Sequence, residues 1–506
     1  MEWKIVIDIG TGGVHVASID ETLLVVCIKY EKIIYKTTKW NGGKELDPDE
    51  LYATIIRLVA KVIAETGYCM GNCRGIVITG QRHGAVFCDG DVTPLLCCPN
   101  VDGRASAEAK EVGDLYGDKV FEITSRWPAS YFPAMRLMWM RKHLPNLYEQ
   151  VKYVLMLNEW TAWKLTGEIT SEPTNAVETL FFDIREMCWS NELRNLFDLD
   201  ALHENELIPS GRRAGFLFSE IAHLLGLSGR VPVYLAPSDT QSAAIGCGAN
   251  RPGDIVVVNG STTPIVCVSS KFLSDSTKSA WLTPYFDGLW LIEANANRSG
   301  IIFRELVDFC VDFVDEIVKK IGLTTDRDAL RGEIMSISEE EGDAIGYWGP
   351  RISNVRLPAI CGTAMLCDTE ANPFASVIPS FIDNLAFAVY ANIELASSML
   401  NKNNNNIWLT GGGSRNNRFC SIVATLSRNK NVARTLTSET TMLGAAAAVA
   451  IINRENAVDV ACIEEKLRKN TEKIIPADDP DILSRRYLLW REYYDQIAEF
   501  HKRRTT

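Results

Sequence analysis

Short apolar runs alternate with turn residues along the first eighty positions. Residues 4–37 hold three strand-like runs separated by turns, which predicts a β-meander. Asp47 is then suited to an N-cap and Pro48 to a first helical position, and the apolar residues that follow have helical spacing. Residues 75–79 return as a buried strand. Three strands, a helix and a strand indicate a ribonuclease-H-like or actin-like domain, because a Rossmann order would place a helix directly after the first strand.

The pattern turns mostly helical between residues 104 and 165, with Trp139, Trp160 and Trp163 as expected core residues. A strand is predicted over residues 231–236. It leads into Ser238-Asp239-Thr240-Gln241 and a helix of small residues.

A composition shift over residues 246–254 predicts a boundary between two domains, 1–246 and 254–506. The strand–turn–strand pattern of the first residues then returns, with a strand at 255–259, a small-residue turn at 260–263 and a strand at 265–268. We therefore expect a duplicated α/β architecture: two actin-like (ribonuclease H-like) ATPase domains with mixed sheets and an interdomain cleft.

A third glycine-rich turn follows a strand predicted at residues 407–410. The asparagine run from Asn403 to Asn406 before this strand is expected to be an exposed loop. The helix after the turn should end near Leu426, and amphipathic helix is expected over the last forty residues.

Composition narrows the class of protein. The chain has 506 residues, 46% of them hydrophobic and 23% charged, as in ordinary multidomain globular proteins. A net charge of −12 without a long basic block argues against a nucleic-acid partner. No apolar run reaches the roughly 18 residues of a membrane span, and no signal peptide is visible, so a soluble cytoplasmic protein is expected.

Fourteen cysteines are scattered without paired C-x-x-C spacing. Free buried thiols are the expected state in a reducing compartment. A zinc site built from Cys69, Cys73, Cys88 and Cys97 is an alternative.

Three strand-ending turns carry candidate phosphate and nucleotide chemistry. Glycines let backbone N–H groups approach an anion closely, Thr11 adds a hydroxyl, and Asp8 is placed to hold Mg²⁺. The first two turns suit phosphates, and the bare backbone of the third suits a base or ribose. The turn residues are Gly10, Thr11, Gly12 and Gly13; Gly260, Ser261 and Thr262; and Gly411, Gly412, Gly413 and Asn416.

Two further segments suit a hydroxyl-bearing substrate. Asp239 lies at a strand-to-helix switch, where it could take a proton from an attacking hydroxyl or simply N-cap the helix. Gln81, Arg82 and His83 offer donors and acceptors for sugar hydroxyls, although such residues also occur in ordinary polar loops. Asp102 could accept from a further hydroxyl or pair with Arg104.

Together these segments resemble the FGGY carbohydrate kinases, a branch of the actin-like ATPase superfamily, from the first hairpin to about Val449. The resemblance rests on Asp8 to Thr11, Gly80 to Gly84, Asn100 to Arg104, Ser238 to Gln241, Gly260 to Thr262, Thr410 to Asn416 and Glu439 to Ala446. It implies transfer of the γ-phosphate of ATP to a sugar or polyol hydroxyl.

The resemblance also implies a role for each matching residue. Asp239 would be the general base, and the hairpins at Asp8 and Gly260 would hold phosphates and Mg²⁺, with Asp8 and Asp239 at the metal. The turn from Gly411 to Asn416 would hold adenosine. The implied substrate contacts are Gln81, Arg82, His83, Asp102, Asp239 and Gln241.

The substrate is less sharply indicated. Gln81-x-His83-Gly84 is similar to xylulose kinases, which usually have Met at the place of Arg82, and Gln81-Arg82 is similar to glycerol kinases, which follow it with Glu. The segments around Asn100 and Ser238 look closer to autoinducer-2 kinases. A ketopentose such as xylulose is the first expectation, with autoinducer-2 and a polyol such as glycerol as alternatives. His15 stands where relatives commonly have Lys or Arg.

Other classes stay open at this point. An actin- or Hsp70-like ATPase would share the phosphate hairpins and need no sugar pocket. A non-catalytic sugar-binding protein would result if His15 impaired the nucleotide site. A nicotinamide-dependent dehydrogenase is disfavoured because no G-x-G-x-x-G follows the first strand. The sequence leaves the oligomeric state open, with a homodimer among the options.

Overall fold

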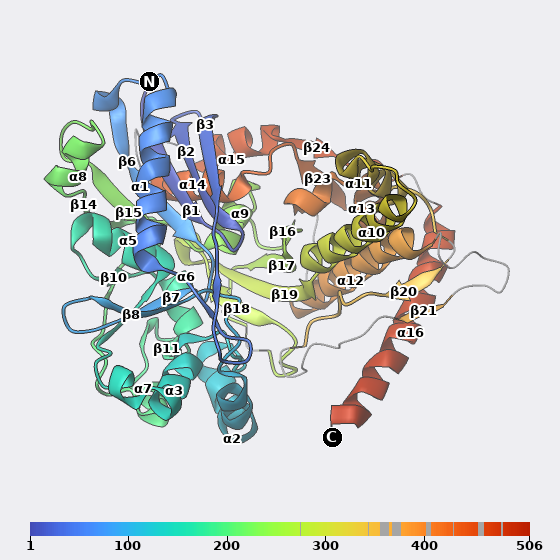
Figure 1. Ribbon diagram of the computed structural model, residues 1–506, viewed down its shortest axis with the longest axis horizontal. Coiled ribbons are helices and arrows are strands. Elements are labelled where there is room, and N and C mark those ends of the chain that lie inside the picture. Colours follow the sequence, from blue (N-terminus) through green and yellow to red (C-terminus); the bar gives the residue numbers. More distant parts are fainter. Residues whose placement is uncertain are drawn as a thin grey trace.

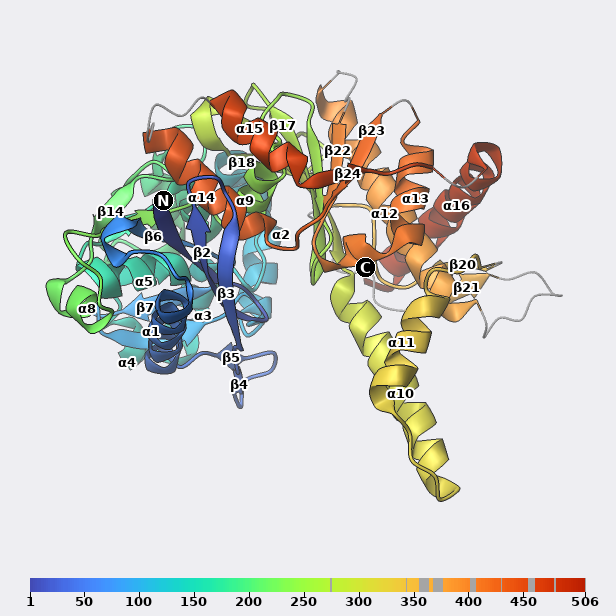
Figure 2. The ribbon, with the colours of Figure 1, turned by 90° about the horizontal axis from the view of Figure 1, so that it is seen from above.

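The chain folds around two large β-sheets that lie side by side, each flanked by helices (Figure 1). The computed structural model describes residues 1–273, 275–342, 344–354, 364–366, 376–400, 406–428, 430–453, 460–476 and 479–505. Seen from above, the two sheets belong to separate lobes, and the α10–α11 helix pair projects from the second lobe (Figure 2).

The first lobe is built on a mixed sheet whose strands come from the first half of the chain. β1 is antiparallel to β2 and parallel to β6, and β2 continues into an antiparallel β3. Within the described residues this sheet has the order β14 (Arg213–Phe216), β15 (Pro232–Leu235), β6 (Cys73–Gly80), β1 (Trp3–Ile9), β2 (Gly13–Asp20) and β3 (Val25–Lys32).

The second lobe repeats this plan. β16 is antiparallel to β17 and parallel to β22, and β17 continues into an antiparallel β19. The described strands have the order β18 (Trp281–Pro284), β19 (Trp290–Arg298), β17 (Thr262–Ser269), β16 (Ile255–Val258), β22 (Asn406–Thr410), β23 (Asn431–Thr435) and β24 (Thr471–Lys473). The series β3-β2-β1-β6-β15 and β19-β17-β16-β22-β23 correspond, so the predicted duplication is confirmed.

Several of the helices pack on the faces of these sheets. Asp47 caps α1 by accepting from the backbone N–H of Asp49 and Glu50, as its sequence predicts. The main helices are α1 (Pro48–Glu65), α2 (Ser106–Thr124), α3 (Pro133–His143), α4 (Pro145–Tyr148), α5 (Leu157–Thr166), α6 (Pro173–Ala176), α7 (Asn191–Phe197), α8 (Ser219–Leu224), α9 (Asp239–Gly246), α10 (Gly300–Lys320), α11 (Arg327–Ile337), α12 (Val377–Leu400), α13 (Asn417–Leu426), α14 (Thr440–Asn453), α15 (Val460–Lys469) and α16 (Pro480–Thr505).

Shorter strands complete the described structure. β7 (Ala85–Cys88) pairs with both β8 (Pro94–Cys98) and β9 (Tyr153–Met156). Four two-stranded pairs are β4 (Lys36–Thr37) with β5 (Lys44–Glu45), β10 (Thr170–Ser171) with β13 (Glu206–Leu207), β11 (Phe182–Asp183) with β12 (Cys188–Trp189), and β20 (Ile345–Tyr347) with β21 (Ala364–Leu366).

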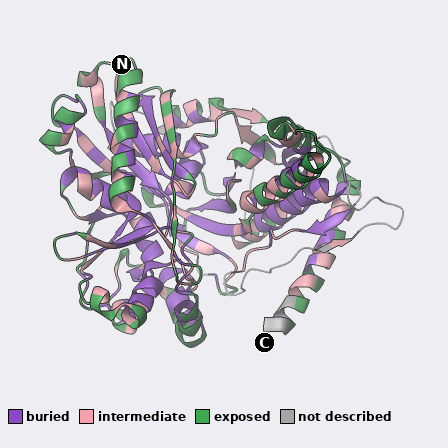
Figure 3. Cartoon of the chain, viewed as in Figure 1, coloured by how far each residue is buried: buried purple, intermediate pink, exposed green. Residues whose placement is uncertain are grey.

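Two helices join the lobes. α9 and α14 pack against each other, and their apolar residues share one buried cluster with residues of both sheets, such as Val6 and Val256. The crossing is close because a Cβ on Gly246 would overlap the Thr440 carbonyl, and one on Gly444 would overlap the Ser242 carbonyl. α14 is almost wholly buried and packs beside β1 and β6. Figure 3 shows the buried residues gathered along the strands of the two sheets, with exposed residues on the outer side of α1. Asp239, the first residue of α9, therefore lies where the lobes meet.

Most of the predicted elements are present, with local differences. β9 interrupts the stretch predicted as helical, because residues 153–156 pair with β7. Asn406 begins β22, whereas Asn403 to Asn405 lie outside the described residues. Trp139 and Trp160 are buried in two different hydrophobic clusters, and Trp163 is partly buried against the cluster that contains Trp160.

The zinc alternative is wrong. Over the described ranges no three His, Cys, Asp or Glu side chains are placed to hold a metal ion by themselves, and all twelve described cysteines are free thiols, several of them buried. Among the described helices, none combines the length and apolar composition that a bilayer crossing requires.

Candidate active site

Asp8 places a carboxylate at the carboxyl end of β1, opposite His15 on β2. Its Oδ1 is buried and lacks a hydrogen-bond partner among the described residues. Burial and the neighbouring Asp239 and Glu439 carboxylates raise the pKa of Asp8 to about 8. A buried oxygen without a donor, close to other negative charge, fits a bound cation.

The turn after Asp8 is held rigidly by residues from the same lobe. Gly10 N donates to Gly13 O at 3.0 Å, and the Tyr30 hydroxyl donates to Gly12 O at 3.1 Å. The Tyr35 hydroxyl donates to Thr11 O, and Asn100 Nδ2 donates to Thr11 Oγ1 at 2.7 Å. The hairpin tip is thus fixed before any ligand arrives, which lowers the entropic cost of binding a phosphate.

Arg82 bridges the lobes beside this hairpin. Its guanidinium donates to both carboxylate oxygens of Glu293 on β19, at 2.7 and 2.9 Å, and its Nε lies 4.0 Å from Asp239 Oδ1. The side chains of Arg82 and Glu293 are only 9% and 1% exposed. Burial alone would lower the pKa of Arg82, but Glu293 and Glu178 outweigh it and keep the guanidinium charged.

His83 lies against Glu178, at 2.8 Å from Nε2 to Oε2, with a backbone φ of 67°. Arg126 donates to both oxygens of Glu178, at 3.2 and 2.8 Å, and also to Leu282 O and Thr283 Oγ1 on β18. Burial lowers the pKa of His83 despite Glu178, so a neutral imidazole is favoured. A neutral ring can donate to Glu178 and present its other nitrogen to a hydroxyl.

Asp239 begins α9 and remains about one third exposed, at 34% of its side-chain surface. Its Oδ1 accepts from Thr240 N at 2.6 Å. Burial raises the pKa of Asp239, and the Arg82 charge opposes that rise. An accessible carboxylate with a raised pKa is suited to accept a proton.

The two glycine-rich turns of the second lobe lie against each other. Asn259 N donates to Thr410 O at 2.7 Å, and Gly413 N donates to Asn259 O at 3.0 Å. Gly411 has a φ of 87°, and a Cβ on Gly413 would overlap the Asn259 side chain. Thr410 Oγ1 also lies 2.9 Å from Thr440 Oγ1, at the start of α14 next to Glu439. The turns at Gly260–Thr262 and Gly411–Gly413 therefore form one surface that connects with α14.

Several predicted ligand contacts are used within the protein. Asp102 is fully buried, accepts from Arg104 Nε at 2.9 Å and lies 3.1 Å from Arg136 Nε. Gln81 accepts from Asn100 N at 3.0 Å and donates to Gly10 O at 3.3 Å. Asn416 caps α13 by accepting from Phe419 N at 2.8 Å. These side chains shape the fold around the site, and Asp102 has the Arg104 pairing that the sequence left open.

Gln241 is a different case. Its side chain is fully buried, and its Oε1 accepts from the Ser238 hydroxyl. Its Nε2 has no hydrogen-bond partner among the described residues. Gln241 supports the start of α9 and keeps one donor unused.

His15 stacks on Tyr30, with ring centroids 4.6 Å apart. Burial lowers the pKa of His15, and Glu439 opposes this effect. The favoured neutral ring brings no positive charge to the hairpin, unlike the Lys or Arg expected there.

Glu178, Glu293 and Glu439 are site residues that the sequence reasoning missed as such. Each comes from a segment far along the chain from its partner, so local spacing gives no sign of the pairing. Glu293 did carry a signal, because it opens the alternation Glu-Ala-Asn-Ala-Asn in an otherwise apolar strand.

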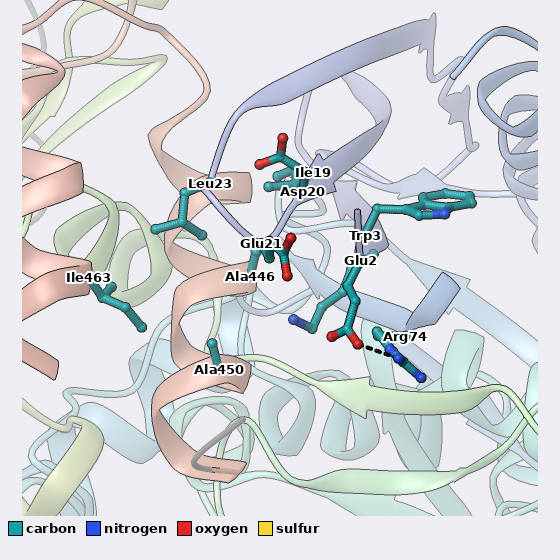
Figure 4. Close-up of a pocket in the computed structure, with 11 residues that line it drawn as sticks. Glu2, Trp3, Ile19, Asp20, Glu21, Leu23, Arg74, Ala446, Ala450 and Ile463 are labelled. Carbon is teal, nitrogen blue, oxygen red and sulfur yellow. Dashed lines mark hydrogen bonds and ion pairs between the residues drawn. The ribbon is translucent and has the colours of Figure 1, made fainter. Parts of the chain in front are cut away.

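A separate hollow lies at the other end of β1, lined by Trp3, Asp20, Arg74 and Ala450 among others (Figure 4). Arg74 pairs with Glu2 there. The hollow has a volume of about 30 Å³, which matches the space of a single water molecule. Five residues of strand, or about 17 Å, separate Trp3 from Asp8, so this hollow is not part of the site.

Comparison with known proteins identifies the family. Residues 3–246 match the model of the N-terminal domain of the FGGY family of carbohydrate kinases, and residues 323–452 match that of its C-terminal domain. The chain belongs to the FGGY family. It is a carbohydrate kinase, a phosphotransferase with an alcohol group as acceptor, and kinases of this family use ATP.

Its relatives span several named kinases. YoaC of Bacillus subtilis (strain 168), provisionally named a sugar kinase, is 26% identical over 87% of this chain and 88% of its own length. The autoinducer-2 kinase of Escherichia coli (strain SMS-3-5 / SECEC) is 24% identical over 88% of this chain and 85% of its own length. The xylulose kinase of Lactococcus lactis subsp. lactis (strain IL1403) is 28% identical over 49% of this chain and 50% of its own length.

Solved structures share the fold. A xylulose kinase from Rhodospirillum rubrum superposes with a TM-score of 0.83 at 18% identity, covering 99% of this chain and 100% of its own. A Plasmodium falciparum glycerol kinase with ADP has a TM-score of 0.81 at 18% identity, covering 98% of each chain. The predicted pair of actin-like domains is thereby confirmed as a fold class.

Proposed function

We propose that this FGGY kinase phosphorylates a ketopentose such as xylulose, with Asp239 as the general base. The supporting observation is the position of Asp239. It is an accessible carboxylate where the lobes meet, 4.0 Å from Arg82, and it is near enough to Asp8 to raise the pKa of that residue. Polar groups suited to hydroxyls surround it, and the two glycine-rich surfaces lie on opposite lobes.

In the proposed reaction the acceptor hydroxyl loses its proton to the Asp239 carboxylate. The freed oxygen attacks the γ-phosphorus, an O–P bond forms, and the bond from that phosphorus to the bridging oxygen breaks as ADP leaves. Arg82 and His83 hold the acceptor in line by contacts with its hydroxyls. Closure of the lobes would exclude water from this transfer.

The nucleotide and its metal ion are assigned by chemistry. The N–H groups of Gly10–Gly13 and Gly260–Thr262 would hold phosphates, and Gly411–Gly413 would hold adenosine. The unpartnered Oδ1 of Asp8, with Asp239 nearby, fits Mg²⁺, which usually binds one or two carboxylates together with substrate phosphates. When bound, Mg²⁺ would neutralise charge on the phosphates, which a neutral His15 does not do.

An ADP-release screen tests this proposal. ATP and Mg²⁺ are supplied with ketopentoses, other ketoses, polyols or 4,5-dihydroxy-2,3-pentanedione. We expect the highest kcat/KM with a ketopentose, and acceptor-stimulated release that is about 10²- to 10⁴-fold slower with Asp239→Asn. ADP release that no acceptor stimulates would overturn the proposal.

One observation favours a second candidate, the phosphorylation of a dihydroxypentanedione. Proteins named autoinducer-2 kinase match this chain over 470 residues, whereas the xylulose kinase relative matches over 251. The same screen separates the two, because a strong preference for the dione over every ketopentose would select this candidate. We also propose a cytoplasmic location. A homodimer stays a prediction that sedimentation of the purified protein would check.

A further inference from the structure

One strand of the second lobe presents a row of polar side chains to the acceptor region. Glu293, Asn295 and Asn297 alternate with Ala294 and Ala296 on β19. Side chains two residues apart in a strand share a face. The two alanines are fully buried in the sheet core, so the polar face is the opposite one. We call Glu293, Asn295 and Asn297 the β19 polar row.

The β19 polar row lines a cavity between the lobes. Trp127, Ala129 and Tyr131 line it from the first lobe, and Trp281 and Arg351 complete it from the second. Its volume is about 110 Å³, the space of three or four water molecules at about 30 Å³ each. This space is large enough for part of a small sugar chain, and the rings of Trp127, Tyr131 and Trp281 beside it suit the C–H faces of such a chain.

The cavity connects with the general base through Arg82. Glu293 is the member of the polar row that accepts from the Arg82 guanidinium, and the Nε of the same guanidinium lies 4.0 Å from Asp239. One guanidinium group therefore separates the wall of the cavity from Asp239. An acceptor whose reacting hydroxyl lies at Asp239 can extend its other end into the cavity.

Asn295 is the member of the row with polar capacity left for a ligand. Glu293 is paired with Arg82. When the Asn297 amide is oriented so that both of its polar atoms have suitable neighbours, its oxygen accepts from Arg351 at 2.6 and 2.8 Å. Asn295 Oδ1 accepts from Asn297 N at 2.7 Å, which orients the side chain. Among the described residues, no hydrogen bond is made by its Nδ2, so that amide is the donor for an acceptor hydroxyl.

We propose that the β19 polar row, through Asn295, binds the end of the acceptor remote from the phosphorylated hydroxyl. The inference rests on the proposed function and names the substrate class as an open-chain polyhydroxylated acceptor longer than three carbons. A three-carbon acceptor reaches Asp239 but leaves the cavity unfilled. Additional hydroxyl-bearing carbons then increase transition-state binding, because they pair with polar groups already held in place.

The test is a chain-length series of ketoses and polyols from three to six carbons, assayed for kcat/KM with the wild-type enzyme and Asn295→Leu. Leucine keeps the approximate size of asparagine and removes the amide. Asn146→Leu, on the exposed surface of α4 in the first lobe, is the matched control. Thermal midpoints and ADP release without acceptor report whether each variant is folded.

For the wild type, kcat/KM should increase with length up to five carbons. Asn295→Leu should lose about tenfold with five-carbon acceptors, the effect of one unmade neutral hydrogen bond, and keep its kcat/KM with the shortest measurable acceptor. Asn146→Leu should match the wild type throughout. An equal loss at every length, or none at five carbons, would overturn the inference, whereas a wild type that no acceptor stimulates would instead refute the proposed function.

Discussion

At the scale of single residues, the site depends on carboxylates kept in unfavourable surroundings. Asp8 and Asp239 are both pushed towards protonation by burial, and Arg82 counteracts this at Asp239. Carboxylates with raised pKa values are typical of sites that bind a cation beside a polyanion and transfer a proton. The positions of Asp8 near the end of β1 and of Asp239 after β15 could be predicted from the sequence, while their chemical roles stay predictions. Glu293 and Glu178 could not, since their arginine partners lie far away along the chain.

The pH dependence of turnover should report the protonation of the Asp239 carboxylate. A protonated Asp239 cannot accept a proton, so activity should fall as the pH decreases. The midpoint of this fall should lie above 3.8, the ordinary pKa of aspartate, because burial raises the pKa of Asp239. Arg82→Gln removes the charge that holds this pKa down, so the acidic limb of kcat/KM should move to higher pH. Arg141→Gln, which removes a surface pair with Asp198, should leave it in place. An acidic limb at the same or lower pH in Arg82→Gln would contradict the assignment.

Removing the Asp8 carboxylate should stabilise the ligand-free protein while abolishing turnover. The folded state holds the Asp8 proton up to about pH 8, and the unfolded state only up to about 4, so this group lowers stability as pH rises between those values. In a chelator and without nucleotide, Asp8→Asn should melt a few °C (about 2–6) above wild type at pH 8. The difference should shrink at pH 5.5. A variant that melts below wild type at pH 8 would show that the carboxylate is not strained.

At the scale of elements, the crossing of α9 and α14 positions Asp239, the proposed general base. α9 begins at Asp239, and α14 begins at Thr440, next to Glu439. The sequence predicted α9 from its small residues, whereas the start of α14 entered only as the segment Glu439 to Ala446 of the family resemblance. It could not show that Gly246 and Gly444 meet, because helix contacts between residues far apart in the chain have no local signature. Asp102 could not be assigned from the sequence for a similar reason. Whether its carboxylate contacts a ligand or pairs with Arg104 depends on how deeply its loop is buried.

Gly444→Ala should separate the two helices. The added methyl group overlaps the Ser242 carbonyl, and overpacking of this kind costs about 1–3 kcal/mol. We expect a lower thermal midpoint and a reduced kcat, because α9 carries Asp239. Gly332→Ala, in the open surroundings of α11, is the matched control and should stabilise the protein by up to about 1 kcal/mol. Similar midpoints for the two variants would argue against a close crossing.

At the scale of the whole molecule, the proposed acceptor region is formed by both lobes. Arg82 and Arg126 of the first lobe bind Glu293, Leu282 and Thr283 of the second. The duplication could be predicted from the order of the strands, and the three glycine-rich turns from the glycine and small residues that follow three of them. The bridging contacts and the β19 cavity could not, because they depend on how the two sheets are placed relative to each other.

Coupling between the lobes should make ATP turnover depend on the acceptor. With its proper acceptor, ADP release should exceed the acceptor-free rate by about 100-fold or more, since closure and exclusion of water need both ligands. Steady-state assays with and without acceptor measure the ratio. A ratio near one would contradict coupling between acceptor binding and ATP turnover.

The most direct test follows the γ-phosphate itself. ATP labelled at the γ-phosphorus is mixed with xylulose and either the wild-type enzyme or Asp239→Asn, and the labelled sugar phosphate and free phosphate are separated. The account predicts label in the sugar phosphate with wild type and a 10²- to 10⁴-fold slower transfer with Asp239→Asn, while nucleotide affinity is retained. Label released only as free phosphate, or transfer by Asp239→Asn at the wild-type rate, would contradict it.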